Sequence, residues 1–484
     1  MQTHFPSGVG SGDGAGLVLA PFHGVRYDLS RVGGLANVTS PPYDVIGPGT
    51  LEQLLAASPY NVVRLILPTY SPGGTAGGDL GGSDPGGDLG GSDPAGDLAD
   101  ADPAGAARAA GEIAAARLRD WLTEGALAVD GAPALYVYEQ RGADWVQRGL
   151  IGLVAVGTGA VHPHEGVMAG PVAGRRELMK ATRSNLEPIL LVYNGGAGAG
   201  GASTGGHGGP AGPGSAGQGS ASRLVDGTAG RQEPLACAVT DDGITHRLWA
   251  VTDPSAQEAI AADLATRTAL IADGHHRYAA YLELQAEMRA AGAGQGPWDY
   301  GLAFLVDADA YPLRLGPIHR VLPRLAPDDA ARRAARAFTV TDLPGDLGAA
   351  LGALTRAARQ GTAFLLAGGD GFRLLTDPDR GCLATAMPRE TSQRWRALDA
   401  SVMQELLLAQ LWSIKDNVRD VLISHDAAEA ARTEADTGGT AVICNPMPLA
   451  DVMDIAAHGE QVPRKSTSFG PKPRTGLVLR TFDS

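Results

Sequence analysis

The stretch from Leu270 to Ala280, Leu-Ile-Ala-Asp-Gly-His-His-Arg-Tyr-Ala-Ala, constrains the fold more than any other part of the chain. The apolar residues Leu270–Ala272 have the pattern of a short buried strand, and the Asp273-Gly274 pair is typical of a sharp turn. An Ala/Leu-rich helix is expected from His275 to about Ala291. A strand, a glycine turn and a helix start present backbone N–H groups and the positive end of a helix dipole at one point. The sequence therefore predicts an α/β unit whose turn favours an anion.

Two glycine-rich segments interrupt the rest of the chain. Residues 77–103 repeat the unit Gly-Gly-Asp-Leu-Gly-Gly-Ser-Asp-Pro, and a Gly/Ser/Ala-rich segment follows residue 194. Both lack the apolar residues that a packed core needs, so we expect disordered insertions. The other segments alternate strand and helix patterns, which predicts mixed α/β sheets. The expected organisation is a disordered tail (1–16), an N-terminal α/β region (17–194) with a low-complexity insertion (71–103), a second insertion (195–232), a core with the central turn (233–325), a small α/β segment (326–398) and a C-terminal helix with a basic loop (399–484).

Charge and composition argue against several classes of protein. The 484-residue chain has a net charge of −14. This acidic balance makes a nucleic-acid coat an unfavoured interpretation, because such a coat needs a basic face. Cys237, Cys382 and Cys444 lie far apart, which is typical of reduced thiols. No apolar run reaches the ~20 residues of a membrane span, and the N-terminus lacks a signal-peptide pattern. We expect a cytoplasmic protein that acts on small molecules.

Local patterns predict several further elements. Asn37–Ile46 reads as a strand followed by a turn, and Thr50–Ala57 as a helix capped by its first residue. Asn61–Leu67 reads as a buried strand. Ala134–Gln140 and Gln147–Thr158 alternate like paired antiparallel strands.

The central turn allows two interpretations. In the first it is a phosphate cradle, in which Gly274 permits close backbone approach, Arg277 makes bidentate contacts, and His275 and His276 donate hydrogen bonds or move a proton. In the second it is an ordinary helix start with Asp273 as N-cap and exposed histidines. Two histidines and an arginine on one turn concentrate positive charge, which favours the first.

A basic loop near the C-terminus is the second candidate. The segment from Arg464 to Arg474 concentrates cations and hydroxyls and is stiffened by three prolines. It suits phosphate or carboxylate recognition, although a solvated surface turn is the alternative. Its candidate binding residues are Lys465, Ser466, Thr467 and Lys472.

Four further groups could serve either a functional or a structural role. His162-Pro-His164-Glu165 could provide a catalytic carboxylate with an orienting histidine, because a metal site would need further ligands that are not evident locally. Tyr43-Asp44 follows a rigid Pro-Pro pair. Arg64 lies among apolar residues, and the structural interpretation is that it pairs with a core carboxylate. His319-Arg320 ends a strand beside the presumed site.

These motifs together resemble the bacterial family DUF1015. The residues that carry the resemblance are Pro-Pro-Tyr-Asp-Val-Ile (41–46), Asn-Val-Val-Arg-Leu (61–65), His-Glu (164–165), Ala-Asp-Gly-His-His-Arg-Tyr (272–278), His-Arg (319–320) and Gly-Glu-Gln-Val-Pro-Arg-Lys-Ser-Thr-Ser-Phe-Gly-Pro-Lys-Pro (459–473). They occur in the family's order from about Leu17 to Arg480. In one element, where the family has Lys-x-Asp-Arg, this chain has Val172, Gly174 and Arg175, so only the arginine is kept.

The central turn is also similar, over some 100 residues, to the ParB/sulfiredoxin-like superfamily and notably to its free-serine kinases. This second resemblance implies a ParB/sulfiredoxin-like core, with Gly274, His275, His276 and Arg277 around nucleotide phosphates. It places Asp273 near the reacting hydroxyl or a metal.

The leading hypothesis is a phosphotransferase that uses ATP or ADP and acts on free serine or a similar hydroxyl compound. Mg²⁺ would be held mainly by the nucleotide, and its protein ligands are not indicated. The expected catalytic residues are Asp273, His275, His276 and Glu165. The expected substrate- and phosphate-binding residues are Gly274, Arg277, His164, Arg175, His319, Arg320, Lys465, Ser466, Thr467, Lys472, Tyr43, Asp44 and Arg64. The alternatives are a ParB-like nucleotide-binding or DNA-associated regulator without kinase activity, and an inactive paralogue that serves as a scaffold.

Overall fold

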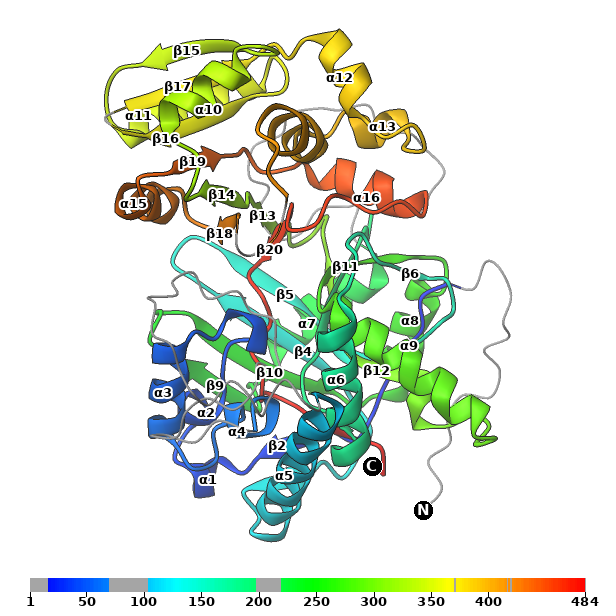
Figure 1. Ribbon diagram of the computed structural model, residues 1–484. Coiled ribbons are helices and arrows are strands. Elements are labelled where there is room, and N and C mark those ends of the chain that lie inside the picture. The colour runs from blue at the N-terminus through cyan, green and yellow to red at the C-terminus, as the bar shows by residue number, and fades with distance from the viewer. Residues whose placement is uncertain are drawn as a thin grey trace.

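The computed structural model describes residues 16–68, 103–196, 219–369, 371–415, 417 and 420–483. They form two lobes, one above the other in Figure 1. Almost all of the predicted tail (1–16) and of the insertion 71–103 lies outside these residues, as do residues 197–218. In the described residues, no helix combines the length and apolar character needed to cross a membrane.

A mixed sheet of nine strands forms the centre of the lower lobe within the described residues (Figure 1). Its strand order is β6-β11-β8-β12-β5-β4-β10-β9, and β1 also pairs with β5. The β11–β6 and β12–β8 pairs are parallel and the other pairs are antiparallel. The strands are β1 (Leu19–Ala20), β4 (Leu135–Arg141), β5 (Val146–Ala155), β6 (Val161–His162), β8 (Ile189–Tyr193), β9 (Ala236–Val239), β10 (Thr245–Val251), β11 (Ala269–Asp273) and β12 (Tyr300–Asp307).

Both faces of this sheet are covered. Alternate residues of β4 belong to two different cores, Tyr136 and Tyr138 to one and Leu135 and Val137 to the other. This follows from the period of two residues in a strand. The helices of this lobe are α1 (Leu29–Val32), α2 (Leu35–Val38), α3 (Pro48–Ala57), α4 (Val63–Ile66), α5 (Pro103–Thr123), α6 (Ala169–Thr182), α7 (Ser220–Arg231), α8 (Pro254–Leu264) and α9 (His275–Ala290), with 3-10 turns η1 (Tyr43–Val45) and η2 (Pro297–Asp299).

The upper lobe contains a second sheet, of order β15-β17-β16-β19-β14-β18. Its strands come from three of the predicted segments, so the predicted divisions at 325 and 398 cut through one sheet. The strands are β14 (His319–Leu322), β15 (Thr339–Leu343), β16 (Phe364–Gly368), β17 (Gly371–Thr376), β18 (Leu422–Ser424) and β19 (Thr440–Ile443). The helices are α10 (Pro327–Ala334), α11 (Leu347–Ala358), α12 (Arg380–Ala386), α13 (Gln393–Arg396), α14 (Asp399–Ser401) with its π-helical continuation η3 (Val402–Leu411), α15 (Ala427–Thr437) and α16 (Leu449–Ala457).

The C-terminal segment joins the two lobes. After α16 it runs down between them (red in Figure 1), where β20 (Ser468–Gly470) pairs with β13 (Arg314–Gly316). It then bridges to Ser40 and Val25, and β21 (Arg480–Thr481) pairs with β7 (Ser184–Asn185). A further two-stranded sheet pairs β2 (Val25–Tyr27) with β3 (Leu127–Val129). The predicted basic loop thus lies at the junction of the lobes.

The structure confirms the mixed α/β class and the antiparallel pair β4–β5. Three local predictions are wrong. Asn61–Leu67 contains helix α4 instead of a strand, because the Asn61 side chain accepts the Val63 N–H and starts a helical turn. Asn37–Ile46 contains the end of α2 and the turn η1. The α3 N-cap is Gly47 and not Thr50, because Pro48 at the first helical position extends the helix forward.

The predicted second insertion, 195–232, also needs correction at its C-terminal end. Residues Ser220–Arg231 form α7, which packs against α8. Ala221 and Val225 are buried in the core on that face of the sheet. The small side chains of α7 are buried because α8 packs close to them. The many glycines of segment 195–232 hid the helical pattern of α7 in the sequence.

Candidate functional site

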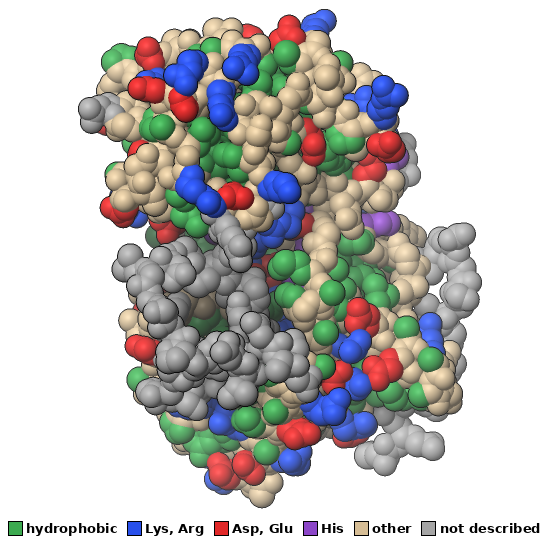
Figure 2. All heavy atoms as spheres, viewed as in Figure 1, with side chains coloured by type: hydrophobic (Ala, Val, Ile, Leu, Met, Phe, Trp, Pro, Cys, Tyr) green, Lys and Arg blue, Asp and Glu red, His purple; other side chains and the backbone are tan. Residues whose placement is uncertain are grey.

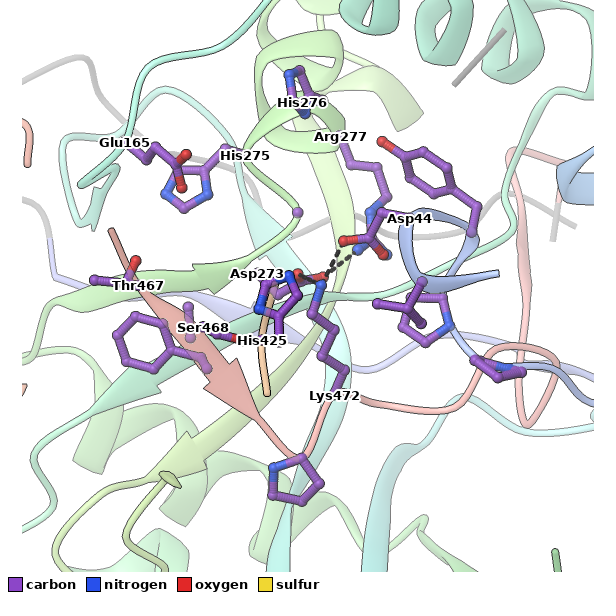
Figure 3. A pocket seen from close by; sticks show the side chains of 18 of the residues that line it. Asp44, Glu165, Asp273, His275, His276, Arg277, His425, Thr467, Ser468 and Lys472 are labelled. Carbon is purple, nitrogen blue, oxygen red and sulfur yellow. Dashed lines mark hydrogen bonds and ion pairs between the residues drawn. The ribbon is translucent and has the colours of Figure 1, made fainter. Parts of the chain in front are cut away.

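A cavity of about 530 Å³ lies where the two lobes meet. Four segments far apart in sequence provide most of its wall: η1, residues 165–171 at the start of α6, the β11–α9 turn and the basic loop 464–474. The rest comes from Ile318 and His425 in the upper lobe and from β4 and the β9–β10 hairpin, which contribute Gln140, Asp242, Ile244 and His246. Figure 3 shows Asp44, Glu165, Asp273, Lys472 and His425 around this space. The fold therefore brings the central turn and the basic loop together, as the sequence predicted.

Glycine is required at the β11–α9 turn. Gly274 has φ 94°, in the left-handed region, and a Cβ there would lie 2.8 Å from Ile189 Cγ2. Gly274 is also the N-cap of α9 and offers no side chain to cap the first turn. The N–H groups of this turn are therefore left for another partner. Asp273 does not cap the helix, so the ordinary helix-start interpretation is wrong in this respect.

A chain of ion pairs, buried at Asp273 and Arg277 and half-buried at Lys472 and Asp44, crosses the cavity wall. The Lys472 ammonium lies 2.5 Å from Asp44 Oδ2 and 2.7 Å from Asp273 Oδ1, and Arg277 Nη2 lies 2.6 Å from Asp273 Oδ2 (Figure 3). Arg277 also donates to Pro188 O at 2.5 Å. Burial alone would raise the pKa of Asp273, but Lys472 and Arg277 outweigh it and hold the pKa below its usual value. Burial opposes the Lys472 charge, yet Asp273 and Asp44 raise the Lys472 pKa.

The paired histidines of the turn hold the loop that carries Glu165. His275 Nε2 accepts the His164 N–H at 3.4 Å, and His276 Nε2 accepts the Met168 N–H at 3.1 Å. The His164 ring lies edge-on to the His275 ring and contacts Thr467 Oγ1 at 2.9 Å. Burial lowers the pKa of both His164 and His275 to about 3, so these rings are neutral at neutral pH. The expectation that the histidines concentrate positive charge is therefore wrong for His275.

Glu165 lies on the basic-loop side of the cavity. Its Oε1 accepts the Lys465 N–H at 2.9 Å. Arg320 holds the same loop from behind, because it donates to Lys465 O at 2.8 Å and to Arg464 O at 3.2 Å while it is only 2% exposed. The Lys465 side chain lines the cavity and forms no ion pair with another described residue.

The lining has a small excess of cations in a chain that is acidic overall. The lining residues include five Lys or Arg and four Asp or Glu within the described part of the chain. The Asp44–Lys472–Asp273–Arg277 chain is internally balanced. The remaining charged lining residues are Arg464, Lys465 and Arg474 against Glu165 and Asp242.

Several predicted site residues do not line this cavity. Arg64 donates to Leu55 O at 2.6 Å and to Ser58 O at 3.4 Å, so it fastens α3 to α4. His319 accepts the Cys444 N–H at 3.2 Å in the upper lobe. Ser466 donates to Pro463 O at 2.5 Å and does not line this space.

Arg175 lies behind the wall and supports Tyr43, which lines the cavity. The Arg175 guanidinium lies 4.0 Å from the centre of the Tyr43 ring and 3.5 Å from Glu187 Oε2. Glu187 also accepts the Tyr43 N–H at 3.2 Å. These contacts fix the turn that carries Asp44. Glu187 was missed by the sequence analysis, as were His425 and Asp242, because each reaches the site from a segment with no motif of its own.

The departures from the family pattern fall outside the cavity lining. Val172 is 2% exposed in the core beneath α6, and Gly174 lies on the same helix. Neither residue lines the cavity. No group of three or more His, Cys, Asp or Glu that could hold a metal ion is present in the described residues.

Comparison with known proteins identifies the family. The profile described as "Protein of unknown function (DUF1015)" matches residues 19–78, 93–200 and 215–401, and the chain belongs to this family. The match ends before the basic loop, so the family resemblance of residues 459–473 stays a prediction. A search of curated proteins gave no match.

Solved structures with a similar arrangement include those named by the local resemblance. A free serine kinase mutant in complex with ADP shares 12% identity at a TM-score of 0.32, covering 64% of this chain and 84% of the kinase. SbnI from Staphylococcus aureus, truncated at its C-terminus, shares 12% identity at 0.33, covering 68% and 87%. A conserved hypothetical protein from Pyrococcus furiosus shares 13% at 0.29, covering 66% and 90%. The ParB/sulfiredoxin-like core itself stays a prediction, because TM-scores this low do not decide it.

Proposed function

We propose that the protein is a nucleotide-dependent phosphotransferase that acts on a small hydroxyl metabolite, with ATP or ADP as donor and free serine as the first acceptor to test. The observation that carries this proposal is the uncapped N-terminus of α9, which faces a cavity also lined by Lys465 and Glu165. Backbone N–H groups and an ammonium without an ionic partner among the described residues are suited to phosphate oxygens. A carboxylate in the same cavity is suited to a hydroxyl proton.

Each group of the site has its own role in the proposed reaction. The first-turn N–H groups of α9 and the Lys465 ammonium would bind the transferred phosphoryl group, whose charge they stabilise as it moves. Glu165 would accept the proton of the acceptor hydroxyl as its oxygen attacks phosphorus. The bond from phosphorus to the bridging oxygen then breaks, and the shortened nucleotide leaves with that electron pair. Mg²⁺ would be bound mainly through the nucleotide phosphates.

Asp273 and Arg277 receive a different assignment from the one the sequence suggested. Both oxygens of Asp273 are held by Lys472 and Arg277, and its pKa is lowered, so it is a poor proton acceptor. Arg277 is 4% exposed and is engaged by Pro188 and Asp273. We assign these two residues to positioning the turn.

Phosphate transfer provides the direct test. Purified protein is incubated with ATP or ADP, serine and a panel of hydroxyl metabolites, and labelled phosphate is followed. Glu165→Gln should retain nucleotide binding and lose roughly 10²–10⁴-fold in transfer rate. Lys180→Ala, at an exposed position on α6, is the control and should behave as wild type.

The outcomes separate the alternatives. Nucleotide binding without transfer to any acceptor would favour a ParB-like regulator or a scaffold. DNA binding that weakens steeply with salt would favour the DNA-associated form. Figure 2 shows Lys and Arg side chains interspersed with Asp and Glu on the visible face, which gives no support to that form.

A further inference from the structure

A second cavity, of about 620 Å³, lies within the upper lobe. Its wall is formed by the end of α11 with the turn that follows, by the start of α14 and η3, and by the segment between β19 and α16. The loop 463–467 separates it from the first cavity, because Ser466 lines the second space whereas Lys465 and Thr467 line the first. The proposed function does not use this cavity.

A carboxyl group without an ionic partner lies in its wall. Asp399 forms no ion pair with another described residue. Its hydrogen-bond donors are Thr362 and the Ala363 N–H. Burial, with the nearby Asp451 carboxylate, raises the pKa of Asp399 to about 6. Asp399 is half-buried, and a partly desolvated carboxylate without a cation is costly, so a cationic ligand group would relieve that cost.

A hydrogen-bond donor that no described residue satisfies lies in the same wall. The Asn445 Nδ2 atom is buried and has no hydrogen-bond partner among the described residues, and Asn445 lines the cavity. Buried amide donors normally find an acceptor, so this group is suited to a carboxylate or carbonyl oxygen of a ligand. Arg359 lines the exposed part of the wall and adds a second donor for an anionic group.

The rest of the wall is largely apolar. Phe364, Leu398 and Met403 are buried side chains that line the space, and Met447 is half-buried beside them. Such a surface accommodates a hydrocarbon body, and methionine side chains adapt to its shape. The cavity therefore offers an acceptor for a cation, donors for an anion, and an apolar surface.

We propose that this cavity binds a small zwitterion with an apolar body, an α-amino acid of the leucine type, whose ammonium is held by Asp399 and whose carboxylate is held by Asn445 and Arg359. Leucine carries no hydroxyl, so it cannot serve as a phosphate acceptor. The proposal therefore stands or falls separately from the proposed function.

Calorimetric titration of the full chain tests it with three matched probes. These are L-leucine, isopentylamine (leucine without its carboxylate) and isocaproate (leucine without its ammonium). Leucine should bind at neutral pH, and both truncated probes should bind at least about tenfold more weakly, because each lacks one charge-assisted hydrogen bond. Equal binding of isopentylamine and leucine would overturn the zwitterion assignment, and no binding of leucine would overturn the site.

Two variants and a control locate the binding. Asp399→Asn should weaken leucine binding at least about tenfold, and Asn445→Leu should do the same if the first variant does not fold. Asp436→Asn, at an exposed position on α15, should leave it unchanged. Wild-type affinity in a folded Asp399→Asn or Asn445→Leu protein would place leucine elsewhere and contradict the proposal.

Discussion

Charged side chains are arranged in opposite ways in the two cavities. At the junction of the lobes, Asp44, Lys472, Asp273 and Arg277 pair with one another within the protein. In the upper lobe, Asp399 has a pKa raised to about 6 and no ionic partner among the described residues. The first arrangement fixes its geometry before any ligand arrives and leaves Lys465 and a helix N-terminus for binding. The second leaves a charge whose partner must come from outside.

The largest expected effect comes from breaking the paired arrangement. Lys472→Met should lower the free energy of unfolding by about 3–5 kcal/mol, because it leaves the buried Asp273 and the half-buried Asp44 without their shared cation. Denaturant unfolding followed by circular dichroism measures this change. The control is Lys180→Met, whose ion pair with Glu287 is exposed and should be worth no more than about 1 kcal/mol. Equal losses in the two variants would remove the distinction between a buried and a surface pair.

The unpaired arrangement should respond in the opposite direction. Asp399→Asn should raise the free energy of unfolding by up to about 3 kcal/mol at neutral pH, because it removes a carboxylate that folding desolvates. The folded pKa is raised, so the native protein binds the proton more tightly than the unfolded chain. Stability therefore falls as the pH rises from the ordinary value of 3.8 to about 6. The stabilisation by Asp399→Asn should disappear below pH 3.8. If the variant is instead less stable than the wild type at neutral pH, Asp399 has a partner in the native protein.

The neutral histidines add a smaller, acid-side effect. His164 and His275 have pKa values lowered to about 3 by burial, so the unfolded chain takes up protons that the folded protein excludes. Each histidine should lower the free energy of unfolding by up to about 1.4 kcal/mol per pH unit as the pH falls below its ordinary pKa of 6.5. His164→Gln should therefore flatten the acid limb of a stability–pH curve. An unchanged slope would mean that His164 is not buried as a neutral ring.

The smallest effect is expected at Arg64. Its guanidinium binds the carbonyls of Leu55 and Ser58 and does not line the first cavity. Arg64→Gln should change nucleotide affinity by less than about twofold, which calorimetry resolves, while stability falls by about 1 kcal/mol. If Arg64→Gln folds normally but loses much of its nucleotide affinity, Arg64 belongs to the binding site.

Sequence patterns correctly predicted elements that depend on interactions between residues close together in the chain. The strand–glycine–helix unit at 270–280 needs only an apolar run, a left-handed glycine and a helix-forming segment, and the structure contains it as β11, Gly274 and α9. The convergence of Glu165 and the basic loop on this turn was also anticipated, although from the family resemblance rather than from spacing. The helix α4 was mistaken for a strand, because a short apolar run has no decisive period.

Contacts between residues far apart in the chain could not be predicted from local sequence patterns. Asp273 was expected to act on a substrate, yet Lys472, almost two hundred residues later, takes one of its oxygens. The histidines were expected to add positive charge, but burial makes His275 neutral. Glu187 precedes a buried strand without any motif, and its contacts with Tyr43 and Arg175 appear only in the folded chain.

Titration of ADP and ATP into the wild type and Lys465→Ala tests the central claim, that the junction cavity binds a nucleotide through the N-terminus of α9 and the basic loop. Lys465 forms no ion pair with another described residue, so its removal should leave the fold intact. The account predicts that one of these nucleotides binds the wild type and that Lys465→Ala weakens this binding by about tenfold or more. Equal affinity in the two proteins, or no binding of either nucleotide to the wild type, would contradict it.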